Sequence, residues 1–334
     1  MFDPFFDMSH AEFGSGPSLG HEFLLTANDH LVSVNSTFGG GSGATSGAAS
    51  GGVSPASTLV GNAHGLEINL IWDSSVTSNV HWASIEASVV AAAKILTGLF
   101  TNHDVLNIAV GFGEVAGSAL APGALGESAS FGYITDEPTV EGALGAADAG
   151  LVHAGLMSAN AVSALQGLSG ENFFVTSAEA KALGLVDPAA GLDGFIGLSS
   201  TAPFSFGGFA PKGSFDAVAV AAHEISEVMG RVGLEGATLG PFANVYTPLD
   251  VFRYSAPGAP DVTPTAGYFS LNDGATNLLP FNDPSNGGDA ADWATAAVTR
   301  GNAFNAFASP GPAYVTPVDL LEMAALGYQV GGHH

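Results

Sequence analysis

A strand, a long helix and a second strand follow one another between residues 66 and 112, and this order constrains the fold most. Residues 66–72 alternate apolar and polar side chains, with β-branched residues among them, as a half-buried strand does. Apolar residues then recur at helical spacing over residues 82–100, and residues 105–112 again have the pattern of a strand. Two strands joined by a helical crossover favour parallel pairing, so the sequence predicts a sheet with both strands side by side.

Charge and composition exclude several classes of protein. Six Lys and Arg residues stand against 31 Asp and Glu residues, which gives a net charge of −25. Nucleic-acid binding requires clustered cations, and an anionic membrane surface would repel this chain. No run approaches the ~20 consecutive apolar residues of a membrane-spanning helix, so we expect no membrane insertion. Cysteine is absent, so any metal must bind through histidine, carboxylate or carbonyl groups.

The composition changes sharply near the N-terminus. Residues 39–57 are mostly Gly, Ser, Ala and Thr, which is typical of a flexible linker. Before them, apolar clusters at 22–26 and 31–34 predict either short strands or a disordered lead-in. We therefore expect a tail and linker over residues 1–57, followed by a main domain.

Several further elements are expected within the main domain. Residues 128–134 form a short strand that is polar on one face and suits the edge of a sheet. Helices are expected over residues 138–148 and 157–167. A strand at 173–176 and a helix at 177–183, ended by Gly184, complete this part.

The helix expected over residues 214–231 carries His223, Glu224 and Glu227. His223 and Glu227 are four residues apart, so both side chains leave the same face and can meet one ion. The helix is mostly apolar and should be buried, and burying three ionisable groups is costly without a counter-charge such as a divalent cation. The alternative interpretation is structural: Glu227 pairs with Arg231, and His223 is an ordinary helix histidine.

This arrangement is close to the His-Glu-x-x-His helix of zinc peptidases. There two histidines hold the metal, and the intervening glutamate polarises a water molecule. Here Glu227 stands in place of the second histidine. A carboxylate oxygen is an acceptable zinc ligand, although its charge weakens the Lewis acidity of the ion.

Longer segments resemble a family of bacterial exported proteins classed as zincin-type metalloproteases. The similarity extends from roughly Gly65 to Tyr328, and its most specific segments are residues 222–231 (AHEISEVMGR), 249–258 and 268–274. It implies an α+β fold of the zincin or metzincin-like type, with a twisted mixed sheet and an active-site helix. The implied division is an N-terminal subdomain over 58–232 and a loop-rich C-terminal subdomain over 233–334.

The resemblance also suggests the remaining site residues. In metzincins such as serralysin the motif continues to a third histidine, but that position is Gly233 here. Asp250 and Tyr254 resemble the Asp-x-x-Tyr region of aspzincin peptidases, with a spacing that differs by one residue. By this resemblance Asp250 is the third metal ligand and Tyr254 is a donor to the oxyanion; a turn aspartate and a core tyrosine are the structural alternatives.

The expected function is therefore zinc-dependent peptide hydrolysis. His223, Glu227 and Asp250 would hold Zn²⁺, and Glu224 would act as general base. A protein or peptide substrate would add as an extended strand along the 128–134 edge.

Two alternatives come from other classes. The first is a zincin-shaped extracellular binding or surface-layer protein without hydrolytic activity. The second is a calcium-dependent adhesin built on an acidic cluster near the C-terminus, where oxygen-bearing side chains surround a Gly-Gly turn. The residues of this cluster are Asp283, Asn286, Asp289 and Asp292.

The N-terminal residues also bear on location. They contain no basic segment and no apolar run, so no cleavable secretory signal is expected. That absence alone would favour the cytoplasm. The cysteine-free, Lys-poor, acidic and Gly-rich composition instead resembles passengers of one-step bacterial export, which needs no such signal. We therefore expect an extracellular protein.

Overall fold

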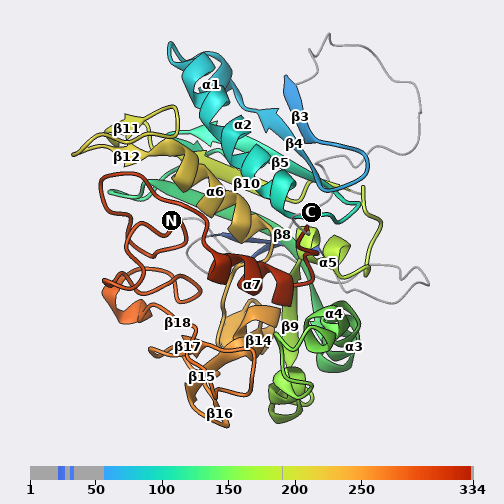
Figure 1. Ribbon diagram of the computed structural model, residues 1–334. Coiled ribbons are helices and arrows are strands. Elements are labelled where there is room, and N and C mark those ends of the chain that lie inside the picture. The colour runs from blue at the N-terminus through green and yellow to red at the C-terminus, as the bar shows by residue number, and fades with distance from the viewer. Residues whose placement is uncertain (1–21, 27–30, 34–55, 190, 332–334) are drawn as a thin grey trace, which may run out of the picture.

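A mixed, twisted sheet lies at the centre of the computed structural model, which describes residues 22–26, 31–33, 56–189 and 191–331 (Figure 1). In the described part of the chain this sheet has ten strands, with the order β13-β14-β9-β8-β10-β5-β4-β3, and with β1 and β2 beside β8. Its strands are β1 (Glu22–Thr26), β2 (Leu31–Ser33), β3 (Ser57–Gly61), β4 (Glu67–Trp72), β5 (Val105–Phe112), β8 (Gly126–Asp136), β9 (Asn172–Thr176), β10 (Gly194–Leu198), β13 (Ala237–Leu239) and β14 (Phe242–Tyr246).

The predicted strand, helix and strand unit is confirmed. Strands β4 and β5 are parallel, with a register that runs from Glu67 opposite Val105 to Trp72 opposite Val110. They are joined by α1 (Ser74–Thr77) and the long α2 (Trp82–Leu99). The sheet contains both parallel and antiparallel pairs, which confirms the predicted mixed sheet and is consistent with an α+β fold.

Helix α2 packs beside helix α6 (Ala217–Val228) on one face of the sheet (Figure 1). It buries Ile85, Val89 and Leu96, which lie on one side of the helix at spacings of four and seven residues. Among the described residues α2 is the one helix long and apolar enough to cross a membrane by length and composition. Its contacts with β3, β4 and α6 are those of a core helix.

The helices between β8 and α6 agree with prediction in part. The expected helices at 138–148 and 177–183 are α3 (Glu137–Ala147) and α5 (Ser177–Ala182), with α4 (Ala149–His153) following α3. The expected helix at 157–167 is instead a 3-10 helix, η1 (Ala161–Leu168).

Beyond α6 the chain has little regular structure until its last helix. The C-terminal part contains short strands, two 3-10 turns and α7 (Pro317–Ala325). Its elements outside the main sheet are η2 (Pro248–Phe252), β15 (Arg253–Ala256), β16 (Ala259–Pro260), β17 (Tyr268–Phe269), β18 (Leu279–Pro280) and η3 (Pro284–Asn286). Two further strand pairs lie outside the main sheet, β6 (Glu114–Val115) with β7 (Ser118–Ala119) and β11 (Phe204–Ser205) with β12 (Phe215–Asp216).

Strand β8 is not the open edge that the sequence predicted. Ser130 pairs with Gly194 of β10 and with Leu25 of β1, and Gly132 pairs with Thr176 of β9 and with Phe23 of β1. A residue in a sheet has one neighbour on each side, so β1 covers the side of β8 opposite β9 and β10. The apolar cluster at 22–26 is thus a strand of the main sheet, whereas residues 39–55 of the predicted linker lie outside the described residues.

Phe23 and Leu25 of β1 belong to a separate apolar cluster, which we call the β1 cluster. Its buried members are Phe23, Leu25, Ile134, Phe174, Leu234, Leu239 and Val245. A much larger core contains the buried residues of α2, α6, β4 and β5. The main core therefore does not include β1.

Asp148, between α3 and α4, is a buried carboxyl group that should make the stability of the protein depend on pH. Its side chain is almost fully buried, and its carboxylate oxygens have no hydrogen-bond partner in the described part of the chain. Burial raises its pKa to about 8, well above the value of about 3.9 that we take for the unfolded chain. The folded state therefore keeps a proton that the unfolded state has lost, and the free energy of unfolding falls as the pH rises from about 4 to about 8.

We expect Asp148→Asn to remove this fall and to raise the free energy of unfolding at pH 8 by a few kcal/mol, since one pKa unit corresponds to about 1.4 kcal/mol. Urea unfolding at several pH values between 4 and 8 measures the effect. The matched control is Asp187→Asn, at an exposed position, which should change stability by less than about 0.5 kcal/mol. Parallel pH profiles for the wild type and Asp148→Asn would contradict the assignment.

Candidate metal centre

The helix that carries the predicted site begins and ends at defined residues. Asp216 precedes α6, and its Oδ1 accepts a hydrogen bond from the backbone N–H of Val218 at 3.0 Å, which caps the first turn. Gly230, with a φ of +112°, ends the helical path. A Cβ at Gly230 would lie 2.9 Å from the carboxyl carbon of Glu179, so the close packing against α5 also requires glycine.

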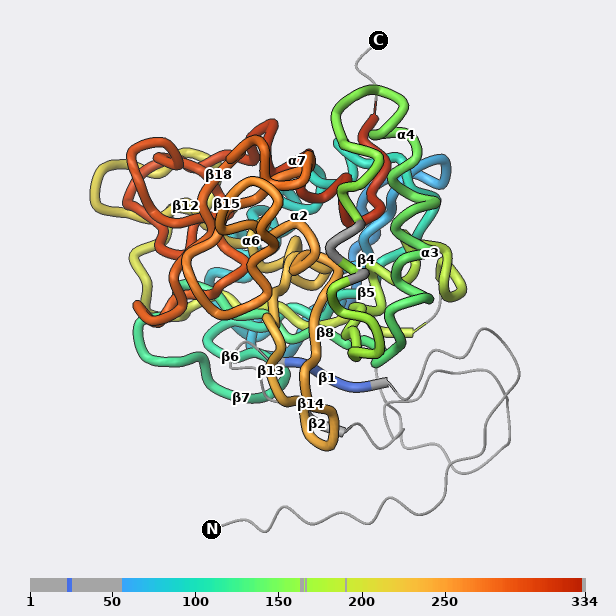
Figure 2. Tube along the Cα trace, turned by 90° about the horizontal axis from the view of Figure 1, so that it is seen from below, coloured from blue at the N-terminus to red at the C-terminus, as the bar shows by residue number. Residues whose placement is uncertain are grey.

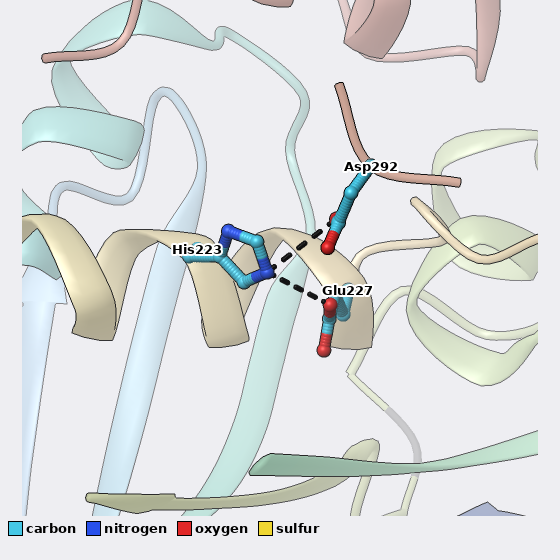
Figure 3. A group of neighbouring side chains, drawn as sticks. All are labelled: His223, Glu227 and Asp292. Atoms are coloured by element: carbon cyan, nitrogen blue, oxygen red, sulfur yellow. Dashed lines mark hydrogen bonds and ion pairs between the residues drawn. The ribbon is translucent and has the colours of Figure 1, made fainter. Parts of the chain in front are cut away.

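Within α6 the structure brings His223 and Glu227 together with Asp292, a residue of the C-terminal part (Figure 3). His223 Nε2 lies 3.0 Å from Glu227 Oε1 and 3.4 Å from Asp292 Oδ1. One donor atom from each of the three residues lies within 4.8 Å of the others. A buried set of one imidazole and two carboxylates at this separation can bind a metal ion.

The orientation of the His223 ring fixes which nitrogen faces the carboxylates. Its Nδ1 lies 2.8 Å from the carbonyl oxygen of Ala303. A carbonyl only accepts, so Nδ1 carries the hydrogen and Nε2 is directed toward Glu227 and Asp292. Two carboxylates around Nε2 require a positive charge, supplied either by a second proton on His223 or by a metal ion. In metal-binding histidines, the ring nitrogen that does not bind the metal commonly donates a hydrogen bond to a backbone carbonyl, as Nδ1 does here.

The ionisation of these groups follows from their mutual contacts. Burial opposes the charged form of His223, but Asp292 and Glu227 outweigh it and the pKa of His223 is raised. Burial likewise acts to raise the pKa of Glu227, whereas His223, Arg231 and a hydrogen bond from Ser128 hold it down to about 2. Ser128 Oγ donates to Glu227 Oε2 at 2.7 Å. Glu227 is therefore an ionised carboxylate at neutral pH.

Arg231 was predicted to pair with Glu227 in the structural alternative to a metal site. Its Nη2 lies 3.5 Å from Glu227 Oε1, and its Nη1 makes an ion pair with Asp292. The side chain is 1% exposed, donates through Nε to Ser226 Oγ at 2.8 Å, and lies over the Phe304 ring. One fixed positive charge therefore faces two carboxyl groups, and a protonated His223 or a metal ion would balance the second charge when both are ionised.

Glu224 is buried beside this group and faces β8. A Cβ at Gly126 would lie 2.3 Å from Glu224 Oε1, so only glycine leaves room for the carboxyl group at the start of β8. Burial, followed by the neighbouring charge of Glu227, raises the pKa of Glu224 well above its usual value. A carboxyl group with a raised pKa next to a metal-binding group suits a residue that takes up and returns a proton.

Asp250, the ligand suggested by the resemblance, lies outside this group. It occupies the third position of η2, and its Oδ2 accepts hydrogen bonds from three backbone N–H groups. The donors are Leu234 at 3.1 Å, Glu235 at 3.0 Å and Thr247 at 2.8 Å. Asp250 therefore holds the loop after α6 in place, and Asp292 stands third beside His223 and Glu227.

The structure does not bring Tyr254 to the group either. Tyr254 is fully buried in β15, and its hydroxyl donates to the carbonyl oxygen of Ala161 at 3.5 Å. Burial raises the pKa of Tyr254 to about 12. These are the properties of a core tyrosine, the structural alternative considered for this residue.

Three residues of the predicted calcium cluster make different contacts in the structure. Asp283 Oδ1 accepts from the backbone N–H of Ser285 at 2.9 Å, and Asn286 exchanges side-chain hydrogen bonds with Asn282. Asp292 joins His223 instead. Among the described residues the one group of three or more potential ligands that meets the spacing of a metal site is His223, Glu227 and Asp292.

A cavity of about 500 Å³ opens next to the group. Glu227 and Arg231 line it on one side, and Ser128 and Leu25 line it from β8 and β1. The loop that Asp250 holds contributes further wall residues, among them Leu234. Through Glu227, the candidate metal-binding group therefore borders a space large enough for part of a substrate.

Two contacts of this site were not predicted from the sequence: that of Asp292 with His223 and that of Ser128 with Glu227. Asp292 was included only as a calcium candidate. A signal was present in its surroundings, because Ala290, Ala291 and Trp293 flank it and an acidic surface loop has no reason to be apolar. Ser128 gave no comparable signal.

No family model, no curated protein and no solved structure matches this chain.

Proposed function

We propose that this protein is a zinc-dependent endopeptidase with a zincin-like fold. The observation that carries the proposal is the orientation of His223, whose Nδ1 is held by the Ala303 carbonyl while Nε2 faces two buried carboxylates. A histidine and two carboxylates, one of them four residues along the same helix, form a donor set that fits Zn²⁺. The proposed ligands are His223, Glu227 and Asp292.

The proposed chemistry divides between the ion and the chain. A divalent ion held there would polarise the peptide carbonyl and lower the pKa of water. Burial raises the pKa of Glu224, and the positive charge of a bound divalent ion would favour its ionised form. As an ionised carboxylate, Glu224 would take the proton of the attacking water and return it to the leaving amine. Ser128 and Arg231 keep Glu227 ionised and in place through their contacts with it.

A second candidate function is supported by Arg231. Its ion pairs with Asp292 and Glu227, together with a protonated His223, balance the charge without any metal. A zincin-shaped binding or surface-layer protein without hydrolytic activity would use the same contacts. For either function we propose an extracellular location, which rests on composition alone.

Metal content distinguishes the two functions. We expect one zinc per chain in the wild type, measured by elemental mass spectrometry after dialysis against zinc. We expect His223→Ala to bind zinc at least about 100-fold more weakly. The loss of a residue that only hydrogen-bonds to a metal ligand already lowers metal affinity by about 10–100-fold, and here a ligand itself is lost. The matched control is His153→Ala, at the exposed end of α4, which should keep the metal.

Two results would contradict the zinc proposal. Equal zinc in the wild type and in His223→Ala would mean that zinc binds elsewhere. A wild type without stoichiometric zinc after dialysis would favour the metal-free binding protein.

A further inference from the structure

Strand β1 occupies the side of β8 that faces the cavity of the candidate site. It runs antiparallel to β8, with a register from Glu22 opposite Tyr133 to Thr26 opposite Ala129 (Figure 2). Within β1, Leu25 lies opposite Ser130, and both line the cavity that also contains Glu227. The strand thus approaches the metal-binding group along the outer side of β8.

The contacts of β1 are those of a docked segment. Phe23 and Leu25, two residues apart, point to the same side of the strand and are buried in the β1 cluster. Phe23 packs edge-to-face on Phe242 of β14, with ring centroids 5.7 Å apart. On its outer side β1 pairs with β2, from Phe23 opposite Ser33 to Leu25 opposite Leu31. Because the main core does not include β1, undocking it would leave that core intact.

We propose that β1 is an intramolecular blocking strand, which occupies the peptide-docking edge of β8 beside the candidate metal centre. The inference rests on the proposed peptidase function and adds its regulation. An extended peptide forms main-chain hydrogen bonds with an exposed sheet edge, and residues 129–133 offer such an edge only when β1 has left. Since β1 belongs to the same chain, it competes at an effective concentration on the order of millimolar.

The position of Leu25 also indicates the class of peptide that replaces β1. Leu25 packs in the β1 cluster with Leu234 and Val232, two apolar residues that also line the cavity. A peptide in the place of β1 puts one side chain at the position of Leu25 and the next but one at the position of Phe23. The favoured occupant is an extended segment with large apolar residues at alternate positions.

The test uses the full chain with a site-specific protease sequence inserted between residues 39 and 55. Cutting at this site leaves β1 present but no longer covalently tied to the main domain. Hydrogen exchange of the backbone amides at 129–133 is measured before and after the cut, and again after dilution. We expect exchange there to rise by about tenfold or more on dilution, and a synthetic peptide of residues 18–36 to restore protection.

A pair of variants in the uncut chain gives an independent measurement. Leu25→Asp places a charge in the β1 cluster and should release β1, whereas Leu24→Asp alters the opposite, half-buried side of the same strand. We expect Leu25→Asp to increase both the exchange at 129–133 and the hydrolysis of an unfolded protein substrate by about tenfold, and Leu24→Asp to change both much less.

The outcomes separate this inference from the proposed function. Unchanged exchange at 129–133, in both the diluted cut protein and Leu25→Asp, overturns the docking of β1. Increased exchange without increased hydrolysis, in a protein that does hydrolyse peptides, overturns the blocking role. If no form hydrolyses peptides, the proposed function fails. Protection of 129–133 by the 18–36 peptide then still supports β8 as a peptide-docking edge.

Discussion

Glu224→Gln is expected to lower peptide hydrolysis by about 10²–10⁴-fold, because a glutamine amide cannot take up a proton from water. The amide has nearly the same shape as the carboxyl group, so it fits the space beside Gly126. Glu224 is not among the proposed ligands, so zinc content should stay at one per chain. Hydrolysis of an unfolded protein and metal content are measured on the same sample.

The matched control for this experiment is Glu179→Gln. Glu179 is also a fully buried glutamate with a raised pKa, but it packs against Gly230, and its carboxyl oxygens have no hydrogen-bond partner among the described residues. We expect Glu179→Gln to keep full hydrolysis. Full hydrolysis by Glu224→Gln would remove Glu224 from the mechanism, and equal losses in both variants would indicate a general effect of removing a buried carboxyl group.

Asp292→Asn is expected to weaken metal binding, whereas Asp250→Asn is expected to lower stability and leave metal binding unchanged. Asp292→Asn replaces a proposed ligand with a weaker, uncharged one and should weaken zinc binding by at least about 100-fold. Asp250→Asn should leave zinc binding unchanged. It should lower the free energy of unfolding by about 2 kcal/mol, because the three backbone N–H groups at its Oδ2 lose a charged acceptor.

Zinc titration and urea unfolding of the two variants provide the measurements. The comparison decides between the ligand given by the resemblance and the ligand given by the geometry. Loss of zinc in Asp250→Asn with retention in Asp292→Asn would restore Asp250 as the third ligand. It would require the loop after α6 to rearrange when the metal binds.

Local patterns predicted the parts of the site that lie on one element. The spacing of His223 and Glu227 places them on the same face of a helix, whatever the rest of the fold does, and α6 has them there. The parallel pairing of β4 and β5 follows from the crossover between them in the same way. Such features depend on helical and strand geometry alone.

Contacts between distant segments could not be predicted in this way. Asp292 reaches His223 from an irregular loop 69 residues further along the chain, where no periodic pattern fixes the direction of a side chain. Strand β8 has an edge-like sequence, but its outer side is covered by β1 from more than 100 residues earlier. The choice of partner for a strand depends on the whole sheet and is not contained in the strand itself.

The position of Arg231 bears on whether the protein can fold before it binds the proposed metal ion. Small zinc domains remain unfolded until the ion binds, because the free energy of metal binding is what stabilises their fold. Here the guanidinium of Arg231 already offsets one of the two carboxylate charges of Glu227 and Asp292, and a protonated His223 would offset the other. Under the proposed function, the polypeptide could therefore fold in a zinc-poor compartment and bind the ion later, so that folding and activation would be separate events.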